Sequence, residues 1–218
     1  MVENLENKAA IVKQIEDSIA LKKALSAQVD IIIQIASLMT EAFRRGNKVL
    51  LFGNGGSAAD AEHIACELAG KYYMNREPLP AIALSANSAA LTAIANDFGY
   101  QEVFGRQLRG LLVKGDVVVG ISTSGSSTNV VSAIEEARKK GAITVALTGK
   151  EGKLRQIAEY VLSIPSTDTP RIQEAHITAG HIICYLVERS LFGTNQPIST
   201  SSNSKQRKAL PEIGGNFI

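Results

Sequence analysis

Two segments of the chain share one pattern, in which a short aliphatic run ends in a turn rich in glycine, serine and asparagine and a helix-forming run follows. The first segment is Val49–Phe52 with Gly53–Ser57, and the second is Val117–Gly120 with Ser122–Ser127. Such a turn leaves backbone N–H groups and a helix N-terminus free to bind an anion. Two such turns in one short chain predict a site for a phosphorylated ligand.

The rest of the chain alternates between strand-like and helix-like runs. We expect strands at 48–52, 81–84, 116–121, 143–147 and 161–164, and helices at 58–71, 88–95, 129–140 and 171–192. This alternation is typical of right-handed crossovers in a parallel sheet that helices cover on both faces. Hydrophobic residues make up 45% of the 218 residues and aromatic residues only 5%, a composition that suits buried parallel strands. We therefore expect one doubly wound, flavodoxin-like α/β domain with a five-stranded parallel sheet. Both turns would lie at the carboxyl ends of the strands, near the change in strand order.

The chain divides into three parts by composition. Residues 1–46 are predicted to form helices, residues 47–192 the α/β domain, and residues 193–218 a polar tail. The segment 29–43 is apolar around too much of its circumference for a lone surface helix, so it needs burial within the domain or against another subunit. Of these two we favour an interface between subunits.

Charge and cysteine usage exclude several classes of protein. A net charge of +2 argues against a nucleic-acid partner, and no apolar stretch approaches the length that spans a bilayer. The first residues, Met1–Asn7, lack the apolar core of a secretory signal. Cys66 and Cys184 have no metal-type spacing and are interpreted as small core residues in a reducing compartment. These observations favour a cytoplasmic protein with no membrane partner.

Four side chains on two predicted helices are candidates for chemistry. His63 and Glu67 are four residues apart, on one face of the helix after the first turn, and Gln173 and His181 are roughly two helical turns apart on the last helix. Such a His–Glu pair is often an ordinary surface contact, but its place just after a phosphate-type turn favours a function. The four groups can bind a divalent metal such as zinc, or the histidine and glutamate can act directly as acid and base. The residues alone leave both roles open.

Several motifs of the chain occur in a characteristic order. They are Gly53–Asn54–Gly55–Gly56–Ser57 with Asp60, His63 and Glu67; Asn96–Asp97–Phe98–Gly99; Gly120–Ile121–Ser122–Thr123–Ser124–Gly125; Leu147–Thr148–Gly149–Lys150; and Arg171–Ile172–Gln173–Glu174 with His176 and His181. Together they resemble the sedoheptulose-7-phosphate isomerases (phosphoheptose isomerases), which have the sugar isomerase (SIS) fold. The resemblance covers about residues 20–192.

The resemblance implies an activity and an assembly. The reaction would be the isomerisation of sedoheptulose 7-phosphate to D-glycero-D-manno-heptose 7-phosphate, in the synthesis of bacterial heptose precursors. The protein would be a homotetramer with active sites at subunit contacts and one Zn²⁺ per subunit.

The resemblance also assigns residues to roles. The zinc ligands would be His63, Glu67, Gln173 and His181, and the acid–base pair would be Glu67 and His181. The phosphate would bind Ser57, Ser122, Ser124 and Ser127. The remaining substrate contacts would come from Asn54, Gly55, Gly56, Glu67, Asn96, Asp97, Thr123, Asp168 and Gln173. The chain departs from some members of the family at Pro170, where they have aspartate, and Asp168 lies two residues earlier.

Two alternative functions belong to the same fold. A related group of SIS proteins binds the replication initiator DnaA without catalysis and lacks the histidine of the last helix, whereas this chain has His181. An isomerase or sensor for another sugar phosphate is the second alternative, because phosphate-binding turns recognise the phosphate and not the sugar.

Overall fold

The computed structural model describes residues 2–193, so the predicted tail lies outside the described residues beyond Gly193. The strands are β1 (Val49–Gly53), β2 (Ala81–Ala83), β3 (Val117–Ser122), β4 (Ile143–Thr148) and β5 (Tyr160–Ser163). The helices are α1 (Val2–Ala24), α2 (Val29–Arg44), α3 (Gly56–Ala69), α4 (Ser88–Phe98), α5 (Gly105–Leu111), α6 (Thr128–Lys139), α7 (Leu154–Ile157) and α8 (Thr169–Phe192), with 3-10 turns η1 (Leu25–Gln28) and η2 (Tyr100–Glu102).

The five strands form one parallel sheet in the order β2-β1-β3-β4-β5. The chain adds β2 on one side of β1 and then β3 on the other, so the strand order reverses between β1 and β3. Gly53 at the end of β1 pairs in register with Ile121 of β3. Both glycine- and serine-rich turns therefore leave the sheet side by side at the reversal, which confirms the predicted fold and the predicted place of the turns.

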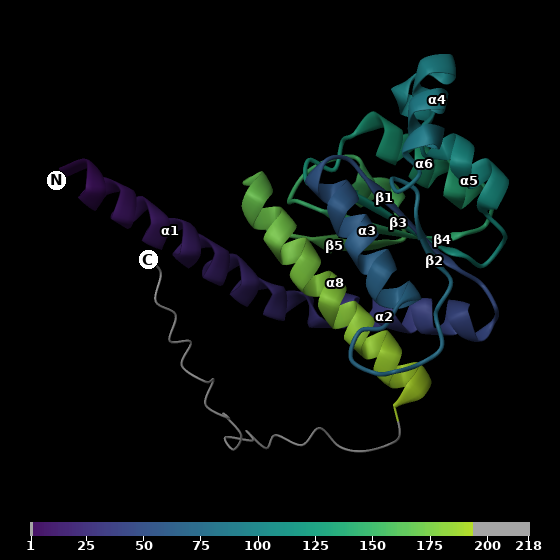
Figure 1. Ribbon diagram of the computed structural model, residues 1–218, viewed down its shortest axis with the longest axis horizontal. Helices are drawn as coiled ribbons and strands as arrows, with labels where there is room; N and C mark the ends of the chain where they lie inside the picture. The colour runs from purple at the N-terminus through teal and green to yellow at the C-terminus, as the bar shows by residue number, and fades with distance from the viewer. Residues whose placement is uncertain (1, 194–218) are drawn as a thin grey trace, which may run out of the picture.

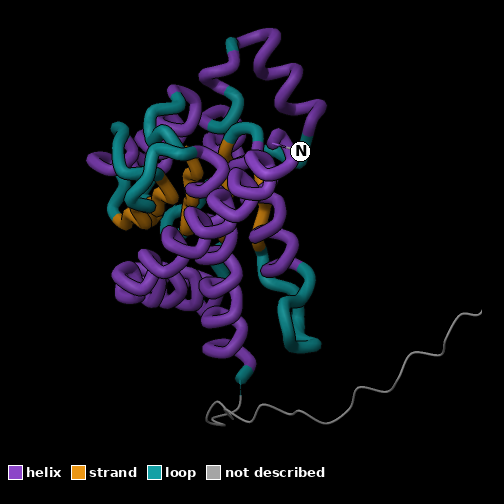
Figure 2. The backbone as a smooth tube through the Cα atoms, turned by 90° about the vertical axis from the view of Figure 1, so that its left-hand side faces the viewer, coloured by secondary structure: helices purple, strands orange, loops and turns teal. Residues whose placement is uncertain are grey.

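Helices cover both faces of the sheet (Figures 1 and 2). One core lies between the sheet and α2, α3 and α8, and the other lies beneath α5 and α6. The central strands β1 and β3 are buried along their whole length, which explains their continuous aliphatic sequence.

The two N-terminal helices differ in how they are used. Ile32, Ile35 and Met39 of α2 are buried in the core, so much of the apolar surface of this helix is covered within the domain. The helix α1 instead extends away from the body of the molecule (Figure 1), and Ile11 and Ile15 on it are exposed. For much of the segment 29–43 the preference for a subunit interface was therefore wrong, because the domain itself buries these residues. An interface at the apolar residues that stay exposed, on α1 and at Val29 and Ile33 of α2, stays a prediction.

The structure corrects three details of the sequence interpretation. Cys66 is exposed on α3, so the expectation of a core position holds only for Cys184, which is buried. The helix α3 begins at Gly56 and α8 at Thr169, each two residues before the predicted start. The short helices α5 and α7 were not predicted, because seven and four residues are too few to show helical periodicity.

In residues 2–193 we find no helix long and apolar enough to cross a membrane.

His176 of α8 is a buried histidine with a structural role. Its side chain is fully buried, and Nε2 lies 3.2 Å from the carbonyl oxygen of Thr148 at the end of β4. Burial lowers the pKa of His176 to about 4, although the hydrogen bond to Thr148 opposes this shift.

This depressed pKa predicts a loss of stability in acid. An unfolded histidine has a pKa near 6.5, so between about pH 6.5 and pH 4 the unfolded chain binds a proton that the native state does not. The free energy of unfolding should therefore fall by about 3 kcal/mol over that range. Urea unfolding at pH 7 and pH 4.5 measures this loss, and His176→Leu should have a smaller pH dependence than the wild type. An equal dependence in both proteins would contradict the prediction.

Candidate active site

Three serine hydroxyls gather at the carboxyl end of β3. Ser122 Oγ lies 3.0 Å from Ser127 Oγ and 3.3 Å from Ser124 Oγ, and the backbone N–H of Ser126 donates to Ser124 Oγ. Ser127 directly precedes α6, so the hydroxyls lie at a helix N-terminus. We call these three residues the serine cluster. It offers donors and a partial positive charge without a formal cation, which suits a phosphate.

The first turn brings a second helix N-terminus to the same edge of the sheet. Gly55 precedes α3 with a φ of 53°, a conformation that glycine adopts without strain. A side chain at Gly53 would lie 2.7 Å from the carbonyl oxygen of Ser57 and 2.8 Å from that of Ile121, so glycine is required where the turn leaves β1. Ser57 is buried in the first turn of α3. The structure thus places all four predicted phosphate-binding serines at the carboxyl ends of the adjacent strands β1 and β3.

The helices α3 and α8 run side by side over one face of the sheet (Figure 1). Gly180 of α8 permits the close approach, because a Cβ there would lie 2.7 Å from the side chain of Ile64. The same contact brings His63 next to His181, although 118 residues separate them in the sequence.

His63, Glu67 and His181 form a compact cluster between these two helices. His63 Nε2 lies 3.1 Å from His181 Nε2 and 3.3 Å from Glu67 Oε1, and the ligand atoms of all three residues lie within 4.8 Å of one another. In a tetrahedral zinc site with bonds of about 2.0–2.1 Å, ligand atoms lie about 3.3 Å apart. The two separations from His63 match this value and the third, between Glu67 and His181, is within 4.8 Å, so two imidazoles and one carboxylate lie close enough to bind one zinc ion.

Gln173 lies at the other end of the α3–α8 contact. A side chain at Gly56 would clash with the Gln173 amide, so this amide lies against the N-terminus of α3. Gln173 thus borders the first anion-binding turn, while His181 lies eight residues further along α8. Its role as a fourth metal ligand or substrate contact stays a prediction.

The other predicted substrate residues lie in two places, Thr123 and Asp168 beside the serine cluster and Asn96 and Asp97 at the end of α4. Thr123 Oγ1 lies 3.5 Å from the hydroxyl oxygen of Thr169, the first residue of α8. Asp168 directly precedes Thr169 and is exposed. A cavity of about 200 Å³ lies beside them and is lined by Thr123, Ser124, Lys150, Glu151, Ser166, Thr167 and Thr169. Asn96 and Asp97 are exposed at the end of α4, where the Asn96 amide donates to the Asp97 carboxylate at 2.9 Å.

Two ionisable groups near the His–Glu cluster have perturbed pKa values. Burial raises the pKa of Asp60 to about 6, and His63 partly opposes this rise. Burial also raises the pKa of Tyr72 to about 12, with a further contribution from its hydrogen bond with Tyr73. The Tyr72 ring stacks on His181 with 5.8 Å between centroids, so a neutral phenol lies against the candidate acid–base histidine.

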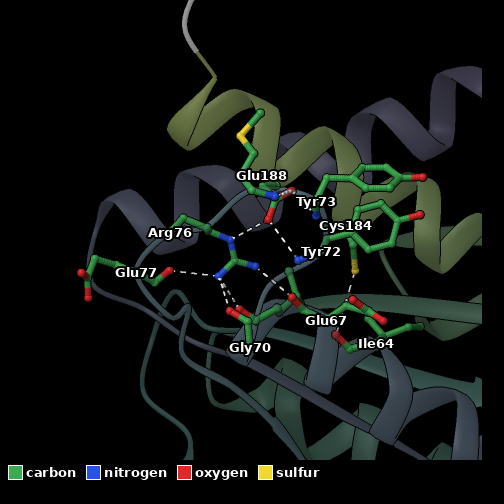
Figure 3. Close-up of polar contacts among 11 residues, drawn as sticks. Ile64, Glu67, Gly70, Tyr72, Tyr73, Arg76, Glu77, Cys184 and Glu188 are labelled. Carbon is green, nitrogen blue, oxygen red and sulfur yellow. Dashed lines mark hydrogen bonds and ion pairs between the residues drawn. The ribbon is translucent and has the colours of Figure 1, made fainter. Parts of the chain in front are cut away.

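A buried ion pair supports the end of α3 that carries Glu67 (Figure 3). Arg76 Nε donates to Glu188 of α8 at 3.0 Å, and both side chains are only 2% exposed. The Arg76 guanidinium also donates to the carbonyl oxygens of Glu67 at 2.9 Å and Leu68 at 2.8 Å.

Glu188 accepts hydrogen bonds from the backbone N–H groups of three consecutive residues, Tyr72, Tyr73 and Met74. Burial by itself would raise the pKa of Glu188, but these backbone bonds and Arg76 outweigh it and lower the pKa. The sequence reasoning missed this pair, because no local spacing links Arg76 to a glutamate 112 residues later.

The fold and this geometry define a class of protein: a doubly wound α/β domain with two anion-binding turns and an adjacent His–Glu cluster. In agreement, residues 10–149 match the SIS domain family. A phosphoheptose isomerase of Aneurinibacillus thermoaerophilus is 47% identical over 186 residues, which cover 84% of this chain and 94% of the relative. One of Geobacter sp. strain M21 is 52% identical over 188 residues, which cover 86% and 96%. The chain belongs to the phosphoheptose isomerase family.

Solved structures agree with this assignment. The phosphoheptose isomerase GmhA of Neisseria gonorrhoeae is 39% identical and superposes with a TM-score of 0.79, over 83% of this chain and 98% of that one. A phosphoheptose isomerase of Francisella tularensis is 34% identical with a TM-score of 0.81, over 84% and 98%. The similarity therefore covers almost the full length of both relatives.

Proposed function

We propose that the chain isomerises sedoheptulose 7-phosphate to D-glycero-D-manno-heptose 7-phosphate, a step toward heptose precursors of bacterial glycans. The His63–Glu67–His181 cluster is the observation that carries this proposal. A sugar-phosphate binding protein needs the two turns, but it does not need this cluster. In the cluster the His63 imidazole lies 3.3 Å from the Glu67 carboxylate and 3.1 Å from the His181 imidazole. The family membership supports the same reaction.

The two turns would bind the phosphate and orient the sugar. The serine cluster and Ser57 supply hydroxyl donors, and the N-termini of α3 and α6 supply partial positive charge. His63 follows the start of α3 by seven residues, so it lies about 10 Å further along the helix. A sugar held by its terminal phosphate would extend from the turns toward the histidine cluster, and this orientation lowers the entropic cost of reaction.

Glu67 and His181 would carry the protons of an aldose–ketose isomerisation. The reaction removes a proton from the carbon next to the carbonyl group and returns one to the neighbouring carbon, through an enediol or enediolate. We assign Glu67 to the transfer at carbon and His181 to the transfer at oxygen. A carboxylate and an imidazole both suit proton transfer near neutral pH.

His63, Glu67 and His181 would also hold a zinc ion. The distances within the three-residue cluster support this assignment. The Gln173 amide lies against the N-terminus of α3 and outside this cluster in one subunit, so its part as the fourth ligand stays a prediction. A bound zinc ion stabilises the negative charge that develops on a substrate oxygen during such a reaction.

Turnover of sedoheptulose 7-phosphate by the purified protein tests the function. We expect product formation that falls after chelation and returns when zinc is added, because the bound zinc ion would stabilise the negative charge that develops on the substrate oxygen. Turnover that survives complete metal removal would overturn the zinc assignment and keep the isomerase. Absence of turnover under every metal condition would overturn the proposed reaction.

We also propose a homotetramer in the cytoplasm. The exposed apolar residues of α1 favour a subunit interface, as does a groove of about 360 Å³ that is lined by Lys22, Leu25, Ser26, Val29, Ile32, Ile33, Thr178, Ile182 and Leu186. The free thiols of Cys66 and Cys184 suit a reducing compartment.

Light scattering measures the assembly directly. We expect an assembly of several chains, because α1 leaves apolar residues uncovered within one subunit, and the resemblance to the family implies about four times the mass of the 23.2 kDa chain. A 23 kDa particle would contradict the tetramer and any active site shared between subunits.

A further inference from the structure

Three polar side chains connect the two anion-binding turns, and the resemblance to the family assigns a role to only one of them, Asn54. Asn54 lies in the turn after β1, Asn129 in the first turn of α6 and Tyr100 in η2. Asn54 Nδ2 donates to Asn129 Oδ1 at 2.9 Å, and Asn129 Nδ2 donates to Asn54 Oδ1 at 2.9 Å. The Tyr100 hydroxyl lies 3.1 Å from Asn54 Oδ1. Asn129 is 2% exposed, whereas Asn54 is partly buried and Tyr100 is exposed, so the amide pair is shielded from water on the Asn129 side.

If both side-chain amides were flipped by 180°, the two asparagines could form an equivalent pair of hydrogen bonds. One backbone group excludes this flipped arrangement. The N–H of Val130 donates to Asn129 Oδ1 at 2.9 Å, and a backbone N–H can only donate. The oxygen of Asn129 must therefore face Val130 and Asn54 Nδ2. Its nitrogen must then face the oxygen of Asn54. Because that oxygen can only accept, the Tyr100 hydroxyl donates to it.

In this arrangement the Asn54 side-chain amide has one N–H donor left to bind another group. Its oxygen accepts from Asn129 and Tyr100, which occupies both lone pairs. One of its two N–H groups donates to Asn129, so one N–H remains. Asn54 is partly exposed, between Gly53 at the end of β1 and Ser57 of α3. It can therefore donate to a substrate oxygen, but it has no lone pair left to accept from a sugar hydroxyl.

We propose that Asn129 is a positioning residue that, with Tyr100, fixes Asn54 as a single N–H donor to an oxygen of the sugar phosphate. This inference rests on the proposed function and specifies the chemistry of the site. The donor selects a substrate with a carbonyl, enediolate or hydroxyl oxygen that accepts at this position. A preorganised donor toward an oxygen that becomes negatively charged is also a means of stabilising the transition state.

The kinetic test uses Asn129→Asp, which keeps the size of the side chain and its acceptor for Val130 but removes the Nδ2 donor. The Asn54 amide then loses the partner that fixes its oxygen. We expect kcat for sedoheptulose 7-phosphate to fall about 10- to 100-fold. KM should rise as well, because aspartate adds a negative charge to the first turn of α6, where the phosphate is proposed to bind, so the fall in kcat is the readout of the positioning role. Asn87→Asp is the matched control, since Asn87 Oδ1 only accepts from Ala90 N–H and aspartate can do the same.

Three outcomes of this test are decisive. Unchanged kcat in Asn129→Asp would overturn the positioning role. An equal loss of kcat in Asn87→Asp would also overturn the positioning role, because the loss would then not depend on the donor that Asn129 provides to Asn54. A loss that appears only in KM would show that Asn129 serves binding alone, and would overturn the role of Asn54 toward a developing charge.

A second measurement does not depend on turnover. In the full chain labelled with ¹⁵N-asparagine, the Asn54 side-chain signal is identified by its loss in Asn54→Asp. We expect it to exchange with water at least about tenfold more slowly than the exposed Asn75 in the wild type, and to lose this protection in Asn129→Asp. Equal exchange at Asn54 and Asn75 would overturn the fixed orientation. Protection in a protein that does not turn over sedoheptulose 7-phosphate would overturn the proposed function and leave the positioning of Asn54 intact.

Discussion

Replacing Glu67 with glutamine should lower turnover of sedoheptulose 7-phosphate by about 10²–10⁴-fold, the range that a general acid–base residue contributes. The amide keeps the shape of the side chain and its place between α3 and α8, but it cannot accept the proton from carbon. Binding of the sugar phosphate should change little, because the turns that hold the phosphate are not altered. Steady-state kinetics and calorimetric binding of the substrate measure the two effects separately.

Glu62→Gln is the matched control, since Glu62 is exposed on the same helix and its replacement removes the same charge. We expect it to retain activity within about twofold, in line with an exposed charge that contacts no reacting atom. The zinc content of Glu67→Gln distinguishes a lost base from a lost ligand. Full activity of Glu67→Gln would refute the proposed mechanism.

Replacing Arg76 with leucine should destabilise the protein by about 3–5 kcal/mol, the usual cost of removing one partner from a buried ion pair. The Glu188 carboxylate would stay buried without its cation, and the carbonyl oxygens of Glu67 and Leu68 would lose their donor. For a chain of this size, such a loss corresponds to a decrease in melting temperature of roughly 10 °C. Differential scanning calorimetry measures the decrease.

Arg109→Leu is the control for this prediction. Arg109 pairs with Glu102 at 2.8 Å, but the two side chains are 41% and 35% exposed. Water already solvates this pair, so we expect a loss below about 1 kcal/mol. If the two arginine variants melted at the same temperature, burial would not be what makes the Arg76–Glu188 pair important. A loss of turnover in Arg76→Leu below its melting temperature would further show that the pair positions Glu67.

The agreement between sequence and structure is best where a property depends on neighbouring residues. The aliphatic runs of β1 and β3 and the turns at Gly53–Ser57 and Ser122–Ser127 follow from local composition and backbone geometry. The spacing of His63 and Glu67 likewise follows from helical periodicity. Short helices such as α7 were missed because one helical turn has no periodic pattern.

The relation of the candidate site residues depends on packing between distant segments. The approach of His181 to His63 requires Gly180 to accept the side chain of Ile64. The two hydrogen bonds between the side-chain amides of Asn54 and Asn129 require β1 and β3 to be neighbours in the sheet.

The sequence by itself therefore determined the class of fold, the two anion-binding turns and the residue types available for chemistry, because these depend on interactions within a few residues. Only the tertiary structure decided which of those residues meet. It brought three candidates together in the His63–Glu67–His181 cluster, buried Arg76 against Glu188 and left Cys66 exposed. The physical reason is that contacts between α3 and α8, and between the two turns, depend on the shape and burial of surfaces that are far apart in the chain.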